Sequence, residues 1–585
     1  MSAPVQSRAQ LARHLTYLLL LTMLASAPVL RYGLPDWGND SLAHAVETKE
    51  FANQFWDGEL YPRWVSAGYG GLGSPTFFYV PTFSRFAVVW LDPLVRSWDP
   101  DGFYLTGLSA AMAILLAAWA VYFWCRTFTS PKAALFGALV YTIQPYHLVV
   151  NLYTRGAMGE LWGCIFPPLI LMAVTRLARS EPSRFPVLPF TALAASYGAL
   201  VMNHFPTTLC FSLVPIAACL YFSQAGARLR VLILTGFAML LGIGLAGASL
   251  GPGLFDQQKV LLEFMTSGMF DYTKLWLFRM ESIFLSQMRL MLLTLATLAL
   301  VIPCFWLALK NLTSTEQKKQ LYFQGGMLFF AIFIASQLSA PIWAVVTPLQ
   351  KLQFPTRFLQ VFIVPVAGIM ALSWPYLKQS GKGLRKKIIP AFVAVGMLLW
   401  VVVTMWGASQ AFRVWRPFTT EERFAVWDFY VTRRMEIYQY LPRTAESEKL
   451  ASVVETPKFL KQYPAREMIL RKPGGEEMSK PTPVSWQPRR IVANVEATEA
   501  GTLRIHHLYF PTWTARRMDN GQSLTVAASK PQGFIEIQAP AGRYQLEIEL
   551  IEETPERIGE QVAMGSALVL VILTWIGWRS RRVQR

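Results

Sequence analysis

Apolar runs about as long as a bilayer is thick dominate this sequence. We count about twelve of them along the 585 residues, at about 15–32, 103–124, 133–150, 161–177, 186–202, 206–222, 231–250, 290–309, 321–340, 358–376, 388–407 and 562–578. An α-helix needs about 20 mainly apolar residues to cross the hydrocarbon core. The composition agrees, since 53% of the residues are hydrophobic and only 15% are charged. The sequence therefore predicts a polytopic α-helical membrane protein and excludes a soluble enzyme.

The positive charges orient these predicted helices. If the amino terminus is cytoplasmic, the seven segments on the cytoplasmic side carry 21 Lys and Arg residues and only two acidic ones, Glu181 and Glu316. Basic, short inner loops are the signature of cytoplasmic segments, so we expect both termini in the cytoplasm. The same distribution accounts for the net charge of +18 without nucleic acid, because anionic membrane lipids are sufficient partners for short basic loops.

This orientation places four segments on the outer side. They are the first outer loop (33–102), a loop near 251–289, a shorter loop near 341–357, and a long region from 408 to 561. Because the inner loops are short, we expect the functional chemistry to be extracytoplasmic.

The chain therefore divides into a transmembrane module (1–407), an extracytoplasmic region (408–561) and a final transmembrane helix with a basic tail (562–585). From about residue 490 the extracytoplasmic region alternates apolar and polar residues, with Gly and Pro between the runs. This period of two is typical of strands, and we expect a small β-sandwich-like domain. The stretch 443–489 is polar and rich in Pro, Lys and Glu, so we expect irregular structure there.

Asp40 and His44 follow the first apolar run and are the candidate catalytic residues. Residues four apart lie on one face of a helix, so the carboxylate and the imidazole would be neighbours. Such a pair at a membrane edge can act as a general base, bind a metal ion, or cap a helix. The spacing leaves these three roles open.

Aromatic residues accompany Arg63 in the same loop. The sequence Tyr61-Pro62-Arg63-Trp64 precedes a run of Gly, Pro and aromatic residues that ends at Pro81. The glycines lack the order of a nucleotide-binding loop. Aromatic rings beside an arginine suit a sugar face or a lipid headgroup, which makes Arg63 a candidate substrate-binding residue. An interfacial aromatic belt is the alternative.

Ionisable and amide side chains at the outer ends of the apolar runs form a third group of candidate substrate-binding residues. They are Arg155, Glu160, Asn203, His204, Asp256 and Arg357. Charged groups at membrane depth are costly and usually have a function. Arg357 has no acidic residue near it in sequence and is suited to hold a phosphate. A structural ion pair between Arg155 and Glu160 is the alternative to a substrate contact.

Together these motifs resemble a known family. The motifs are Asn39–His44, Tyr61–Trp64, Phe77–Pro81, Tyr153–Glu160, the pair Asn203-His204, and Leu352–Phe358. The combination resembles the bacterial membrane proteins labelled 6-pyruvoyl-tetrahydropterin-synthase-related, and more distantly the YfhO-like proteins, within the GT-C glycosyltransferase superfamily. The label borrows the name of a soluble pterin enzyme, and nothing in the sequence indicates that activity.

The resemblance implies a GT-C-like enzyme of the bacterial cytoplasmic membrane. Such an enzyme takes a sugar from a polyprenyl-phosphate carrier and transfers it to an envelope glycan, lipid or protein acceptor on the outer face. By this analogy Asp40 would deprotonate or orient the acceptor hydroxyl and His44 would support it. Arg155 or Arg357 would neutralise the departing lipid phosphate. A divalent metal is possible, although Asn39 stands where some GT-C subfamilies have a second acidic residue.

Two other functions are compatible with the sequence. A transporter or flippase of lipid-linked sugars would have polar or broken helices near the bilayer midplane. Here the charged residues cluster at the outer ends of the runs, which favours the enzyme. A noncatalytic scaffold for envelope assembly would instead use the outer region to bind partners.

Overall fold

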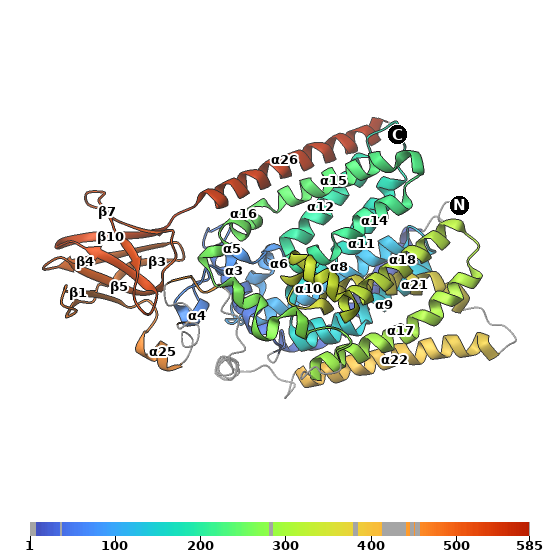
Figure 1. Cartoon of the computed structure of the whole chain (residues 1–585), viewed down its shortest axis with the longest axis horizontal. Helices are drawn as coiled ribbons and strands as arrows, with labels where there is room; N and C mark the ends of the chain where they lie inside the picture. The colour runs from blue at the N-terminus through green and yellow to red at the C-terminus, as the bar shows by residue number, and fades with distance from the viewer. Residues whose placement is uncertain are drawn as a thin grey trace.

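The computed structural model describes residues 7–35, 38–279, 285–377, 384–411, 440–444, 450 and 457–583. These residues form a bundle of helices with a β domain at one end (Figure 1). Two parts of the predicted topology, residues 378–383 of an inner loop and 412–439 of the outer region, lie outside the described residues.

Each predicted apolar run overlaps one helix or two consecutive helices. These are α1 (Arg8–Ala25) with α2 (Ala27–Tyr32), α8 (Phe103–Cys125), α9 (Pro131–Ile143) with the π-helix η2 (Tyr146–Arg155), α10 (Met158–Gly163) with α11 (Phe166–Ala178), α12 (Val187–Asn203), α13 (Phe205–Phe211) with α14 (Leu213–Phe222), α15 (Arg228–Leu245) with α16 (Gly247–Phe255), α17 (Leu285–Asn311), α18 (Thr315–Ala335), α21 (Leu359–Leu377), α22 (Leu384–Ala411) and α26 (Thr554–Val583). Within the described ranges nine spans are long and apolar enough to cross a bilayer, and a bent pair that begins with α18 makes ten. The protein is thus a multi-pass helical membrane protein.

A proline divides the third span just before the site. Gln144 takes an extended conformation ahead of Pro145, which ends α9, because the residue before a proline is pushed out of the helical region. The chain then winds as the π-helix η2 up to Arg155 and stops at Gly156, whose φ of 65° is left-handed. Short π segments are rare and occur often at functional sites. The break determines where Arg155 lies at the end of the span.

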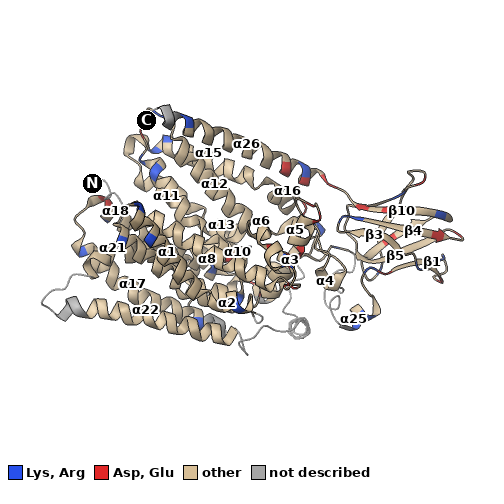
Figure 2. Ribbon diagram, turned by 180° about the vertical axis from the view of Figure 1, so that it is seen from behind, with Lys and Arg blue, Asp and Glu red and all other residues tan. Residues whose placement is uncertain are grey.

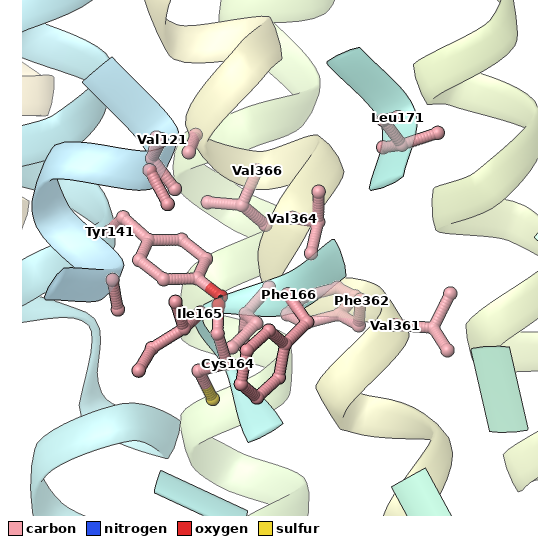
Figure 3. Packing of buried hydrophobic residues seen from close by; sticks show 14 of the residues in the cluster. Val121, Tyr141, Cys164, Ile165, Phe166, Leu171, Val361, Phe362, Val364 and Val366 are labelled. Carbon is pink, nitrogen blue, oxygen red and sulfur yellow. Dashed lines mark hydrogen bonds between the residues drawn. The ribbon is translucent and has the colours of Figure 1, made fainter. Parts of the chain in front are cut away.

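The bundle has a central helix and peripheral helices. The apolar window of α21 is 89% buried inside the protein, whereas that of α26 is only 6% buried, so α21 is the centre and α26 faces lipid. Around α21 the side chains of Val121, Phe166 and Phe362 interlock (Figure 3). The Tyr141 hydroxyl donates a 2.9 Å hydrogen bond to the Cys164 carbonyl, so this buried polar group is satisfied.

The β domain is a sandwich of two antiparallel sheets. Its strands are β1 (Met468–Arg471), β2 (Glu477–Ser479), β3 (Pro483–Gln487), β4 (Arg490–Ala497), β5 (Gly501–Leu508), β6 (Trp513–Arg517), β7 (Ser523–Leu524), β8 (Val526–Ala528), β9 (Phe534–Ala539) and β10 (Gly542–Leu550). The sheet orders are β2-β1-β5-β9-β8 and β3-β4-β10-β6-β7. The irregular structure expected over 443–489 is wrong from residue 457 onward, where α25 (Pro457–Gln462) and β1 to β3 form. These strands are only three to five residues long, and neither β2 nor β3 has a buried residue, so the stretch shows no clear alternation of apolar and polar residues.

The first outer loop packs into this sandwich. Its helices are α3 (Ser41–Trp56), α4 (Gly68–Gly71), α5 (Thr76–Tyr79), α6 (Phe83–Val88) and α7 (Asp92–Val95). Trp64 and Phe78 of this loop belong to the same buried cluster as the strands, and the Phe78 ring stacks on Phe510 at 5.6 Å between centroids. Gly73 (φ 90°) allows this approach, because a Cβ there would lie 2.4 Å from the Trp64 ring nitrogen. The aromatic residues of this loop therefore form mainly a buried contact between the loop and the β domain.

Basic and acidic residues lie mostly at opposite ends of the bundle. Lys and Arg gather at the end where both chain termini lie, away from the β domain, and acidic residues lie mostly toward the other end (Figure 2). The two short outer helices α19 (Ala340–Val345) and α20 (Thr347–Gln350) precede α21. This arrangement agrees with the orientation predicted from the basic loops.

Cysteine labelling tests the predicted orientation, since all five native cysteines are buried. Gln522→Cys lies in an exposed turn of the β domain, and Ser183→Cys lies in an exposed basic loop at the opposite end. We expect a membrane-impermeant maleimide to label Gln522→Cys in intact cells and to label Ser183→Cys only after permeabilisation. The reverse pattern would show that the topology is inverted.

Candidate functional site

Asp40 begins helix α3 but does not cap it. Its side chain makes no hydrogen bond to the first turn of the helix. Its backbone N–H instead donates to the Arg155 carbonyl at 2.7 Å, and its Oδ2 lies 3.4 Å from Arg155 Nη2. The side chain remains 29% exposed, so the carboxylate is reachable from outside. Helix capping, one of the three roles that the spacing left open, is therefore not what this carboxylate does.

Arg155 joins Asp40 to the bundle. The same guanidinium places Nη1 2.8 Å from Glu160 Oε1. Gly156 makes this geometry possible, because its positive φ turns the chain from η2 into α10 and a Cβ there would lie 2.1 Å from Ser41 Oγ. The ion pair between Arg155 and Glu160, expected as the alternative to a substrate contact, is present.

Glu160 is the buried centre of the cluster. It is 1% exposed and faces a second arginine, Arg357, whose Nε lies 3.7 Å from Glu160 Oε1. Arg357 comes from the short helix η9 (Pro355–Phe358), and its Nη2 donates to Gln353 Oε1 at 2.9 Å. We call the four residues Asp40, Arg155, Glu160 and Arg357 the ion-pair chain. It is formally neutral, which is how the buried Arg357 and the partly buried Arg155 are tolerated beside a buried carboxylate.

Asn203 and His204 lie against the ion-pair chain at Gly159. Asn203 Nδ2 donates to the Gly159 carbonyl at 2.7 Å, and a Cβ on Gly159 would lie 2.7 Å from the His204 ring. The His204 Nδ1 is 2.6 Å from Thr207 Oγ1 at the start of α13. Six of the nine predicted site residues, drawn from four separate segments of the sequence, are thus gathered in one place.

His44 belongs to a neighbouring ion pair that the sequence did not reveal. Its Nδ1 lies 3.8 Å from Glu47 Oε2, and the Arg85 guanidinium contacts the same carboxylate oxygen. Burial by itself raises the pKa of Glu47, but Arg85 and then His44 hold that pKa below its usual value. Glu47 could have been found as the residue three after His44 on a helix. Arg85 could not, because it comes from a distant part of the loop.

Arg63 and Asp256 lie apart from the ion-pair chain. Arg63 is completely buried and its donors contact Glu556 Oε1, Glu560 Oε1 and the Ala248 carbonyl, each at 3.0 Å. It therefore ties the first outer loop to the last span, α26. Asp256 pairs with Lys259 at 2.8 Å, and burial raises the pKa of its carboxyl group. Their roles as substrate-binding residues stay predictions that these contacts do not support.

The divalent metal considered from the sequence finds no donor set here. Among the residues that the structure describes, no group of three or more His, Cys, Asp or Glu side chains could hold a metal ion. We therefore derive no step through a metal.

No protein-family model and no curated protein matches the chain. Its fold resembles the arabinofuranosyltransferase AftD from Mycobacteria at 16% identity and a TM-score of 0.45, over 70% of this chain and 27% of AftD. It resembles ArnT from Cupriavidus metallidurans, bound to undecaprenyl phosphate, at 13% identity and a TM-score of 0.45, over 83% of this chain and 98% of ArnT. The oligosaccharyltransferase AglB from Archaeoglobus fulgidus matches at 13% identity and a TM-score of 0.40, over 77% of this chain and 60% of AglB. With TM-scores below 0.5 these are loose likenesses, and they do not establish the function of this chain.

Glu160→Gln should destabilise the protein strongly. The substitution leaves the buried Arg357 and the partly buried Arg155 without their shared carboxylate, and breaking a buried ion pair costs about 3–5 kcal/mol. We expect a clearly lower unfolding temperature of the purified protein in detergent. The matched control is Glu316→Gln, which removes the exposed partner of Arg179 and should leave the unfolding temperature nearly unchanged. Equal effects of the two substitutions would contradict the central role of Glu160.

Proposed function

We propose that this protein is a membrane glycosyltransferase that transfers a sugar from a polyprenyl-phosphate carrier to an envelope glycan, lipid or protein acceptor on the extracytoplasmic face. One observation carries the proposal. A partly exposed carboxylate, Asp40, is held by an arginine instead of capping its own helix, beside a second arginine at the same end of the bundle. The proposal agrees with the GT-C resemblance of the sequence motifs.

Asp40 acts on the acceptor in this scheme. As the acceptor oxygen attacks the anomeric carbon of the sugar, the hydroxyl proton passes to the Asp40 carboxylate. The bond between that carbon and the phosphate oxygen breaks, and its electron pair leaves on the phosphate. Arg155 holds Asp40 from one side through Nη2, which leaves the rest of the carboxylate free to face the acceptor.

Arg357 and Arg155 stabilise the departing phosphate. The Arg357 Nε is buried and has no hydrogen-bond acceptor among the described residues, and its distance of 3.7 Å from Glu160 is too long for a hydrogen bond. A phosphate oxygen would satisfy this donor. Glu160 balances the two cations while no lipid phosphate is bound. Donors that are already oriented toward developing charge are the largest single source of rate enhancement in many enzymes.

The many spans suit a lipid-borne donor. The polyprenyl tail stays in hydrocarbon while its headgroup reaches the outer end of the bundle, and the donor is already activated. The protein then has mainly to position two substrates and to offset charge on the leaving group. The β domain, joined to the first outer loop through Trp64 and Phe78, lies on the side from which a glycan or protein acceptor would arrive.

A second candidate function is transport of the same lipid-linked sugar. The observation that favours it is a break in the third span at Gln144, where both amide atoms are buried without partners among the described residues. Asn151 in η2 has the same property. Broken helices with free polar groups are typical of transporters. We prefer the enzyme because the charged groups lie at the end of the bundle rather than around this break.

Asp40→Asn should abolish transfer while leaving the fold intact. Losing a general base typically costs a factor of about 10² to 10⁴ in rate. In a strain without the native gene, we expect the Asp40→Asn protein to accumulate polyprenyl-phosphate sugar as the deletion does, measured by mass spectrometry of extracted lipids. The control is Asp57→Asn, an exposed position at the end of the same helix, which should restore the wild-type profile.

Two outcomes would argue against the enzyme. If Asp40→Asn restored the wild-type profile while deletion of 408–561 did not, the protein would be a scaffold. If the accumulated carrier sugar were protected from membrane-impermeant periodate in intact cells, it would lie on the inner leaflet and transport would be favoured.

A further inference from the structure

An apolar groove opens on the side of the bundle that faces the lipid, at the end opposite the ion-pair chain. It lies between α12, α15 and α26, which run side by side (Figure 1), and has a volume of about 300 Å³. Leu234, Phe237 and Leu241 of α15 form one wall, and Val569 and Leu573 of α26 form another. Phe185, just before α12, and Phe190 within it close the third side. The proposed transfer reaction does not use it.

Two arginines stand at one end of this groove. Arg230 lies on the same face of α15 as Leu234, Phe237 and Leu241, because the spacings of four, three and four residues keep all of them on one stripe. Its Nη2 donates to the Arg184 carbonyl at 2.6 Å, and Arg184 immediately precedes Phe185 of the groove wall. The groove therefore changes from purely apolar to basic at its mouth.

Neither Arg184 nor Arg230 forms a salt bridge among the described residues, although Glu181 lies in the same loop as Arg184. Arg230 Nη1 is covered by its neighbours and has no hydrogen-bond acceptor among the described residues, so no protein group that the structure describes balances this guanidinium. Arg228 begins α15 and Arg579 lies near the end of α26, so both add positive charge at the same end of the bundle.

The length of the groove matches one leaflet. Eleven residues separate Arg230 from Leu241, which at about 1.5 Å per residue is about 16 Å. Half of a hydrocarbon core of about 30 Å is about 15 Å. A lipid with its phosphate at the arginines would therefore end its chain near Leu241, whereas a much longer polyprenyl chain would overrun the groove.

We propose that this groove binds an anionic phospholipid of the leaflet at the basic end. One acyl chain lies against Phe237 and Val569, whose side chains are 60% and 46% exposed in the structure. The phosphate contacts Arg184 and Arg230. Basic pockets between transmembrane helices on the cytoplasmic side recognise anionic headgroups in this way. The occupant fastens α26, the least buried span, to α12 and α15.

Native mass spectrometry of the full-length protein with added lipid tests this site. We expect phosphatidylglycerol to be retained in preference to phosphatidylcholine. The double substitution Arg184→Gln with Arg230→Gln should weaken retention of phosphatidylglycerol on the order of tenfold. Leu234→Trp, which fills the groove and keeps both arginines, should weaken retention of both lipids. The matched control, Lys310→Gln, removes an exposed cation at the same end of the bundle and should behave as wild type.

Three results would overturn the proposal. They are equal retention of the two lipids, no effect of either groove substitution, and a protein mass that shows a second copy on this face instead of lipid. Because the readout is lipid retention, the result is independent of glycosyl transfer. A failure of the proposed function would leave it unchanged.

Discussion

The buried carboxylate of Glu160 holds together the end of the bundle at which the residue 33–102 loop lies. Burying a charge is affordable only when opposite charges face it, and here Arg155 and Arg357 do so from two different segments. Arg155 in turn reaches Asp40 at the start of α3. The need to balance one buried charge thus brings η2, α10, η9 and the first outer loop to one point, and it leaves Asp40 as the member of the chain that solvent can reach.

The remaining charged residues are distributed as expected for a protein that crosses a bilayer. Short basic loops lie at the end with the chain termini, and the acidic groups that carry out or support the proposed chemistry lie at the other end. The outer end is further joined by Arg63, which links the first loop to Glu556 and Glu560 of α26, and by Trp64 and Phe78 in the core of the β domain. The loop that carries Asp40 is therefore fixed on two sides, by the helices and by the sandwich.

Much of the fold follows from the sequence, because apolar length and loop charge are local signals. Every predicted apolar run overlaps an observed helix because the length of an apolar run can be read directly from the sequence. The strands between Met468 and Gln487 were missed because they are short and because β2 and β3 have no buried residue that would produce an apolar alternation. Arg155, Glu160 and Arg357 could be named as charges at span ends, but their pairing depends on tertiary packing. The ion pairs of Arg63 could not be predicted for the same reason, since its partners come from the far end of the chain, and its role as a substrate-binding residue stays a prediction.

The π-helix at Tyr146–Arg155 also had no sequence signal beyond the preceding proline. It matters because it ends at the residue that joins both carboxylates, so the site depends on a backbone irregularity and on the left-handed Gly156 that follows it.

The most direct measurement of the central claim is an experimental structure of the full-length protein with a polyprenyl phosphate bound. The account predicts that the phosphate contacts Arg357 or Arg155 and that the Asp40 carboxylate faces the same space. A phosphate bound elsewhere, with the ion-pair chain closed and Asp40 shielded from it, would contradict the account.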